Sequence, residues 1–126
     1  MDGEDVRDIL RLLAAYAQTL DQGRIDDHLD LYVEDCRLEA FDRAYEGKER
    51  LRRFMENAHA GQHLTGVPAI DDDGTDAAIV NSDFVFFRAD LQLFTAGTYH
   101  DEIRRTADGW RFVSRRIDMR IGPPSE

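Results

Sequence analysis

The sequence predicts an α+β domain in which N-terminal helices pack on a curved, mainly antiparallel sheet and enclose a pocket. Helical spacing of apolar residues dominates the first half of the chain, and runs typical of strands dominate the second half. Asp108-Gly109 favours a tight hairpin between the last two runs. Helices segregated from an antiparallel sheet are typical of this class, and the concave side of such a sheet leaves room for a pocket.

Composition and charge exclude several classes of function. The 126 residues include 26 acidic and 16 basic side chains, which gives a net charge of −10. This balance opposes binding to nucleic-acid phosphates and to anionic membrane surfaces unless a local basic patch overrides it. No apolar stretch approaches the length that crosses a bilayer, and the N-terminus lacks the pattern of a signal peptide. We therefore expect a cytoplasmic protein that binds neither nucleic acid nor membrane, folded as one domain over residues 1–126.

Cysteine usage argues against disulfides and structural metals. The single cysteine, Cys36, excludes an internal disulfide, and no cysteine–histidine spacing indicates a zinc site. Because Cys36 shares the apolar face of its predicted strand with Leu38 and Ala40, we predict a buried structural thiol rather than a nucleophile.

Three helices are predicted in the first half of the chain. Apolar residues three and four positions apart draw one stripe on a helix over residues 6–20, which Gly23 ends. A short second helix begins at Asp26, and a third follows Gly47. Between the last two helices, residues 36–41 alternate apolar and polar side chains and are predicted to form a half-buried strand.

Strands are predicted throughout the second half of the chain. Their ranges are 63–70, 77–89, 91–105 and 110–121, with a polar turn at 71–74. Residues 122–126 are predicted to form an irregular tail. Consecutive strands joined by short turns favour antiparallel pairing.

Asp21 is the first candidate functional residue, because its charged side chain is predicted to point towards the core. At about 100° per residue, Tyr16 lies on one edge of the apolar stripe of the first helix and Asp21 on the other. A carboxylate there costs several kcal/mol unless it is paired or hydrogen-bonded. His63, between Gly61 and Gly66, is a candidate partner, since histidine moves protons near neutral pH and a carboxylate fixes its tautomer. A structural role for His63 is the alternative.

The remaining histidines are weaker candidates. His28 lies among acidic residues on the short second helix, and His59 ends the third helix. His100 shares the outer face of its strand with Glu102, which predicts an exposed or interfacial side chain.

The last two strands supply candidate substrate-binding residues. Tyr99 and Asp101 share a face with Ile103, which predicts that they point inward. Strict alternation places Arg116 on the same face of the last strand as Trp110. If that face lines the pocket, Arg116 binds an anionic group or stabilises an enolate oxygen. The alternative is that Arg116, or another strand arginine, neutralises Asp101.

Several phrases, in this order, resemble the SnoaL-like family. They are Ala15-Tyr16-Ala17 with Leu20-Asp21 and Gly23, Leu31-Tyr32 with Glu34-Asp35, Gly61-Gln62-His63-Leu64, and Gly97-Thr98-Tyr99-His100-Asp101 with Asp108-Gly109-Trp110-Arg111. The resemblance covers nearly the whole chain. It implies the cystatin-like, cone-shaped α+β fold that scytalone dehydratase, ketosteroid isomerase and bile-acid dehydratases share.

The resemblance also implies a catalytic set consisting of Tyr16, Asp21 and His63. In the dehydratase members the histidine takes a proton next to a carbonyl or conjugated system, the aspartate orients the histidine, and the tyrosine polarises the oxygen. Water is then eliminated through an enolate-like state without a cofactor. The implied substrate is small and hydrophobic, cyclic or polyketide-like.

Departures from the family patterns leave a second hypothesis open. The position of the ketosteroid isomerase base is Ala40 here, although Asp101 matches its second aspartate. The second histidine of scytalone dehydratase is missing near residues 87–90. The last segment also resembles the small, non-catalytic subunit of ring-hydroxylating dioxygenases. The chain is thus expected to be either a dehydratase or isomerase, or a ligand-binding or assembly subunit. A homodimer is expected in both cases.

Overall fold

The computed structural model describes residues 1–122, so most of the predicted irregular tail lies outside the described residues. The elements in chain order are α1 (Gly3–Asp21), α2 (Ile25–Leu29), β1 (Tyr32–Ala40), β2 (Arg43–Glu46), α3 (Lys48–Glu56), β3 (Gly61–Thr65), β4 (Ala69–Asp72), β5 (Ala77–Arg88), β6 (Leu93–Thr106) and β7 (Gly109–Ile121). No helix within this part of the chain is long and apolar enough to cross a membrane.

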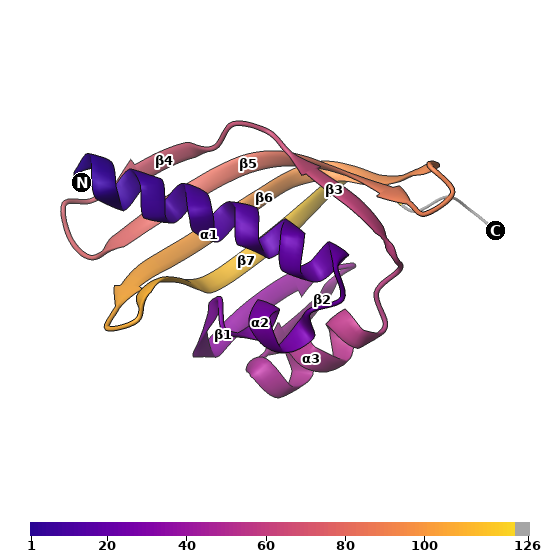
Figure 1. Ribbon diagram of the computed structural model, residues 1–126, viewed down its shortest axis with the longest axis horizontal. Coiled ribbons are helices and arrows are strands. Elements are labelled where there is room, and N and C mark those ends of the chain that lie inside the picture. The colour runs from indigo at the N-terminus through magenta and orange to yellow at the C-terminus, as the bar shows by residue number, and fades with distance from the viewer. Residues whose placement is uncertain (123–126) are drawn as a thin grey trace.

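The strands form one mixed sheet in the order β2-β1-β7-β6-β5-β3, and β4 also pairs with β5. The β1–β7 pair is parallel, and the other pairs are antiparallel. Figure 1 shows α1 lying across the long strands, with α2 and α3 grouped beside β1 and β2. The arrangement confirms the predicted α+β fold of helices on a curved, mainly antiparallel sheet.

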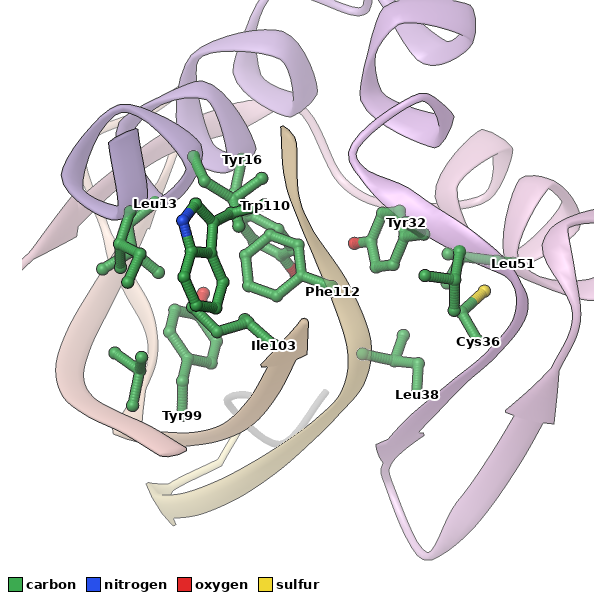
Figure 2. Packing of buried hydrophobic residues seen from close by; sticks show 14 of the residues in the cluster. Leu13, Tyr16, Tyr32, Cys36, Leu38, Leu51, Tyr99, Ile103, Trp110 and Phe112 are labelled. Atoms are coloured by element: carbon green, nitrogen blue, oxygen red, sulfur yellow. The ribbon is translucent and has the colours of Figure 1, made fainter. Parts of the chain in front are cut away.

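The core lies between α1 and the sheet. Figure 2 shows Leu13 and Tyr16 of α1 facing Trp110 and Phe112 of β7. All four side chains are buried, and each contributes roughly 1.5–3 kcal/mol through the hydrophobic effect. Cys36 is also fully buried, as predicted, and burial raises the pKa of its thiol.

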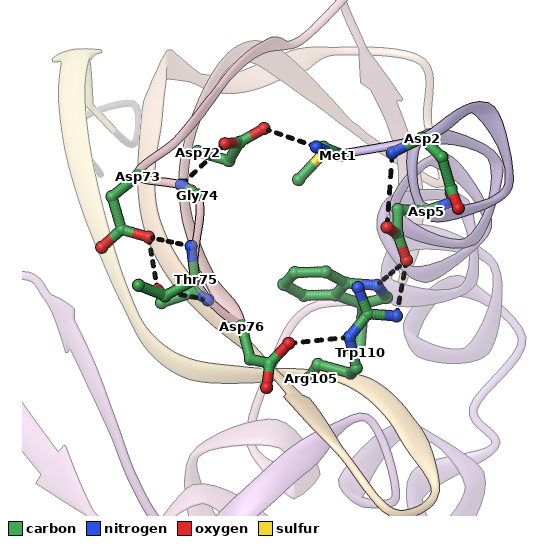
Figure 3. Close-up of polar contacts among 11 residues, drawn as sticks. Met1, Asp2, Asp5, Asp72, Asp73, Gly74, Thr75, Asp76, Arg105 and Trp110 are labelled. Atoms are coloured by element: carbon green, nitrogen blue, oxygen red, sulfur yellow. Dashed lines mark hydrogen bonds and ion pairs between the residues drawn. The ribbon is translucent and has the colours of Figure 1, made fainter.

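A polar cluster fixes the N-terminal end of α1 to the sheet (Figure 3). Asp5 accepts a hydrogen bond from the Trp110 indole at 3.3 Å and pairs with Arg105 at 2.6 Å. Arg105 also contacts Asp76 at 3.1 Å, and its guanidinium lies 4.9 Å from the centre of the Trp110 ring. Hydrogen bonding and pairing with Arg105 hold the pKa of the Asp5 carboxyl well below its usual range. The cluster thus ties the first turn of α1 to β6 and β7.

The strand predicted over residues 63–70 is two strands. β3 ends at Thr65 and β4 begins at Ala69. Pro68 lies between them and has no backbone N–H to donate to a ladder. The four-residue strand β2 was not predicted, because its alternating pattern is too short to detect.

A bulge in β7 exchanges the two faces of the strand part-way along. Ile103 pairs with Phe112, whereas the preceding residue, Glu102, pairs with Ser114, so β7 holds one extra residue at this point. Beyond the bulge, Arg115 points inward and Arg116 is exposed. The prediction that Arg116 shares the inner face with Trp110 is therefore wrong.

Candidate active site

Asp21 and His63 form a closely bonded pair. His63 Nδ1 lies 2.6 Å from Asp21 Oδ1, and the His63 backbone N–H donates to Asp21 Oδ2 at 2.8 Å. The His63 side chain is only 13% exposed, and that of Asp21 only 8%. The pairing supplies the partner that a carboxylate at the end of the apolar stripe requires.

Local structure explains why the two side chains meet. Asp21 is the last residue of α1, and the chain turns away at Gly23, whose φ of +71° favours glycine. His63 lies on β3 opposite Phe86 of β5, with the two ring centres 4.5 Å apart. Gly61 lets β3 approach β5 closely, because a Cβ there would lie 2.1 Å from the Phe87 carbonyl oxygen.

The bonding pattern makes His63 a suitable general base. When Nδ1–H donates to Asp21, the lone pair of neutral imidazole resides on Nε2. The Asp21 carboxylate also stabilises the imidazolium that forms when Nε2 takes a proton. Within residues 1–122, His63 Nε2 has no hydrogen-bond partner in the protein.

Both residues line a large cavity beneath the helices. Its volume is about 1200 Å³. The lining is rich in aromatic and aliphatic side chains, which are Tyr16, Leu20, Ile25, Phe41, Tyr45, Phe54, Met55, Phe84, Phe86, Phe94, Tyr99, Ile117 and Met119. A cavity of this size and lining suits a small hydrophobic ligand.

Tyr16 belongs to the same cavity. Its ring centre lies 6.5 Å from that of His63, with the rings nearly perpendicular. Burial raises the pKa of the Tyr16 hydroxyl, and the positive charge of Arg115 partly opposes this effect. Tyr16 therefore keeps its proton at neutral pH and can donate a hydrogen bond to an oxygen atom in the cavity.

Arg115 and Asp101 form a buried ion pair behind Tyr16. Arg115 Nε and Nη2 donate to the two carboxylate oxygens at 2.6 and 2.7 Å. The guanidinium carbon lies 3.9 Å from the centre of the Tyr16 ring and 3.7 Å from that of Tyr99. Sequence reasoning missed Arg115 because the β7 bulge is invisible in the alternating pattern.

The three predicted substrate-binding residues are placed differently from one another. Tyr99 lines the cavity. Asp101 points inward as predicted, but Arg115 occupies both of its oxygens and it does not line the cavity. Arg116 lies on the outer face opposite His100 of β6, away from the cavity, which corrects the prediction that it faces a substrate.

His28 is a buried histidine that sequence reasoning ranked too low. The Thr19 hydroxyl donates to the Ala15 carbonyl at 2.6 Å, so it accepts from His28 Nδ1–H at 2.9 Å. His28 Nε2 then accepts from the Tyr32 hydroxyl at 2.9 Å. Burial, and then the charge of Arg115, lower the pKa of His28 to about 4. The available signal was its position next to Leu29 on the apolar side of α2.

Comparison with known proteins identifies the family. A model of the SnoaL-like domain matches residues 2–116. The chain belongs to the SnoaL-like family. Uncharacterized proteins of Mycobacterium tuberculosis and Mycobacterium bovis are each 31% identical to this SnoaL-like protein over 126 residues, covering 92% of this chain and 85% of the relative.

Solved structures confirm the cystatin-like fold of this SnoaL-like protein. A Nostoc punctiforme protein of unknown function with a cystatin-like fold has a TM-score of 0.89 and 22% identity, and covers 98% of this chain and 97% of its own. A scytalone dehydratase-like protein of Novosphingobium aromaticivorans has a TM-score of 0.80 and 19% identity. The match covers 96% of this chain and 93% of that protein. The beta subunit of an aromatic-ring-hydroxylating dioxygenase from the same organism has a TM-score of 0.75 and 23% identity. The match covers 88% of this chain and 86% of that subunit. At these identities the likeness shows the fold alone.

Proposed function

We propose that this SnoaL-like protein is a cofactor-independent dehydratase or isomerase that acts by proton abstraction on a small hydrophobic, cyclic or polyketide-like substrate. The observation that carries the proposal is the His63–Asp21 pair, bonded at 2.6 Å and lining a cavity of about 1200 Å³. Tyr16 lines the same cavity as a neutral hydroxyl donor. A base, its orienting carboxylate and an oxygen-polarising donor are the parts that enolate chemistry needs.

The proposed reaction begins with His63 Nε2 taking a proton from the carbon next to a carbonyl group. The C–H electron pair forms a carbon–carbon double bond, and the negative charge moves to the oxygen, which the Tyr16 hydroxyl stabilises. In a dehydration, the enolate re-forms the carbonyl and expels a hydroxyl group from the β-carbon, which leaves as water with the proton from His63. In an isomerisation, His63 returns its proton to a different carbon.

The cavity also bears on the non-catalytic alternative. Phe84 and Phe86 line the cavity and do not fill it, so space for a ligand exists. An assembly subunit has no need of a buried base with an orienting carboxylate. The His63–Asp21 pair therefore favours the proposal of catalysis, because the assembly hypothesis does not explain it.

We further propose that the protein is a homodimer that associates through the outer face of the sheet. This face is charged, with Arg37–Glu39 and His100–Asp118 contacts at 2.9 and 3.8 Å. An interface of this kind weakens with salt. Light scattering after size-exclusion chromatography at low and high salt tests the dimer, and a monomer at both contradicts it.

Deuterium exchange tests the proposed chemistry without knowledge of the natural substrate. Cyclic ketones and β-hydroxy ketones are incubated with the protein in D2O, and exchange at the α-carbon is followed by NMR. We expect exchange with the wild type and a loss of about 10²–10⁴-fold in His63→Ala, the usual contribution of a general base. Stability should change little, because the backbone N–H of residue 63 still donates to Asp21.

Arg11→Ala is the control, since Arg11 is exposed on α1 and lies neither at the cavity nor on the outer face of the sheet. Wild-type exchange in this variant together with its loss in His63→Ala supports the proposal. No exchange with any carbonyl compound, or equal exchange in His63→Ala and the wild type, contradicts it.

A further inference from the structure

We propose that Arg43 and Arg53 bind an anionic group of the ligand at the mouth of the cavity. The ligand would then be an amphipathic anion, with an apolar body towards His63 and a carboxylate, sulfonate or phosphate towards the two arginines. The identification of this ligand as the substrate rests on the proposed function; the binding site itself does not.

The two arginines lie where the cavity opens to solvent. Arg43 is on β2 and Arg53 is on α3, and both line the cavity while being exposed. Glycine-initiated α3 packs against β2, with the rings of Tyr45 and Phe54 4.7 Å apart. The arginines therefore lie next to aromatic side chains of the cavity lining. Such side chains lower the local dielectric constant, which strengthens the attraction between a guanidinium and an anion.

No carboxylate forms a close contact with either guanidinium in the described part of the chain. Within residues 1–122, Arg43 and Arg53 take part in no ion pair, although the chain as a whole has a net charge of −10. By contrast, Arg52, the chain neighbour of Arg53, contacts Asp26 at 2.7 Å. Arg88 also lines the cavity and contacts Asp90 at 2.7 Å.

Within residues 1–122, the two acidic residues of the cavity lining form no ion pair with Arg43 or Arg53. Asp21 and Glu56 are the carboxylates among the lining residues in the described part of the chain. Asp21 is engaged by His63, and Glu56 is exposed. Arg43 and Arg53, without an ion pair within residues 1–122, lie at the mouth of a cavity whose lining is rich in aromatic and aliphatic side chains. They favour a ligand with one anionic end, because arginine matches oxyanions with two parallel hydrogen bonds.

A pair of fluorescent probes separates charge from apolar contact. 1-Anilinonaphthalene-8-sulfonate carries a sulfonate on an apolar ring system, and N-phenyl-1-naphthylamine has the same rings without the charge. Their dissociation constants are measured by fluorescence titration for the wild type and Arg43→Gln/Arg53→Gln. Arg7→Gln/Arg50→Gln is the matched control, because it removes the same charge from exposed arginines that do not line the cavity.

We expect about a five-fold loss per guanidinium at contact distance, and so about 25-fold weaker binding of the sulfonate by Arg43→Gln/Arg53→Gln. Binding of the neutral probe, and of both probes to the control variant, should change less than about two-fold. Added salt should narrow the difference for the sulfonate. Competition by hexanoate and by hexyl phosphate then shows which oxyanion the site prefers.

Two results would overturn the inference. The first is unchanged sulfonate affinity in Arg43→Gln/Arg53→Gln, and the second is an equal loss for both probes, which would mean that the arginines only shape the cavity. The sulfonate should bind His63→Ala as it binds the wild type. Failure of the catalytic proposal, seen as unaffected exchange in His63→Ala, is thus distinguishable from failure of the anion site.

Discussion

Protonation of His28 should couple the stability of this protein to pH. His28 is fully buried, and its pKa falls from the ordinary value of about 6.5 to about 4 in the folded chain. Between these two values the unfolded chain binds the proton and the folded chain does not. The free energy of unfolding therefore decreases as the pH falls through this window, and below about pH 4 this residue adds no further loss.

The shift corresponds to about 3 kcal/mol, at about 1.4 kcal/mol for each pH unit. Urea denaturation of the wild type and of His28→Gln, at steps from pH 7.5 to 4, measures it. Carboxylates with lowered pKa values, such as Asp83 and Asp90, also weaken the fold on acidification, but they do so in both proteins. The difference between the two slopes therefore isolates His28.

We expect the wild type to lose about 3 kcal/mol more than His28→Gln over this range. Parallel slopes would refute the assignment of a buried neutral imidazole. If His28→Gln does not fold, the NMR titration of the His28 ring in the wild type replaces the comparison. A ring that titrates near pH 6.5 would give the same refutation.

Three further substitutions test the surroundings of the site. Asp101→Asn should cost about 3–5 kcal/mol in urea denaturation because it leaves Arg115 buried without a counter-charge; a loss below about 1 kcal/mol would contradict the pairing. Gly61→Ala should lower both stability and α-proton exchange, since its Cβ would meet the Phe87 carbonyl oxygen at 2.1 Å; wild-type values in both assays would rule out the close approach. Arg116→Ala should change neither the stability nor the α-proton exchange; a loss of exchange would mean that Arg116 contributes to the site after all.

Most of the fold could be predicted from the sequence, because long periodic segments carry strong signals. The helix over residues 6–20 repeats its apolar pattern over more than two turns. The three long strands repeat theirs over several pairs of residues. What could not be predicted depends on single residues or tertiary contacts. The break at Pro68 and the extra residue in β7 are local interruptions of a pattern that remains apolar on both sides.

The candidate site divides in the same way. The Asp21–His63 pairing was predictable because a carboxylate on the edge of an apolar stripe demands a partner. Arg115 was not predictable, since its inward direction depends on the bulge. His28 was undervalued because its acidic neighbours suggested exposure, whereas α2 turns it beneath α1 towards Thr19.

A double-variant cycle on His63 and Asp21 tests the central claim most directly. Asp21→Asn, His63→Ala and the combined variant are compared for α-proton exchange with one carbonyl compound. If Asp21 acts through His63, Asp21→Asn slows exchange and the combined variant is no slower than His63→Ala. If the two effects multiply, or if Asp21→Asn exchanges at the wild-type rate, the pair does not work as one base.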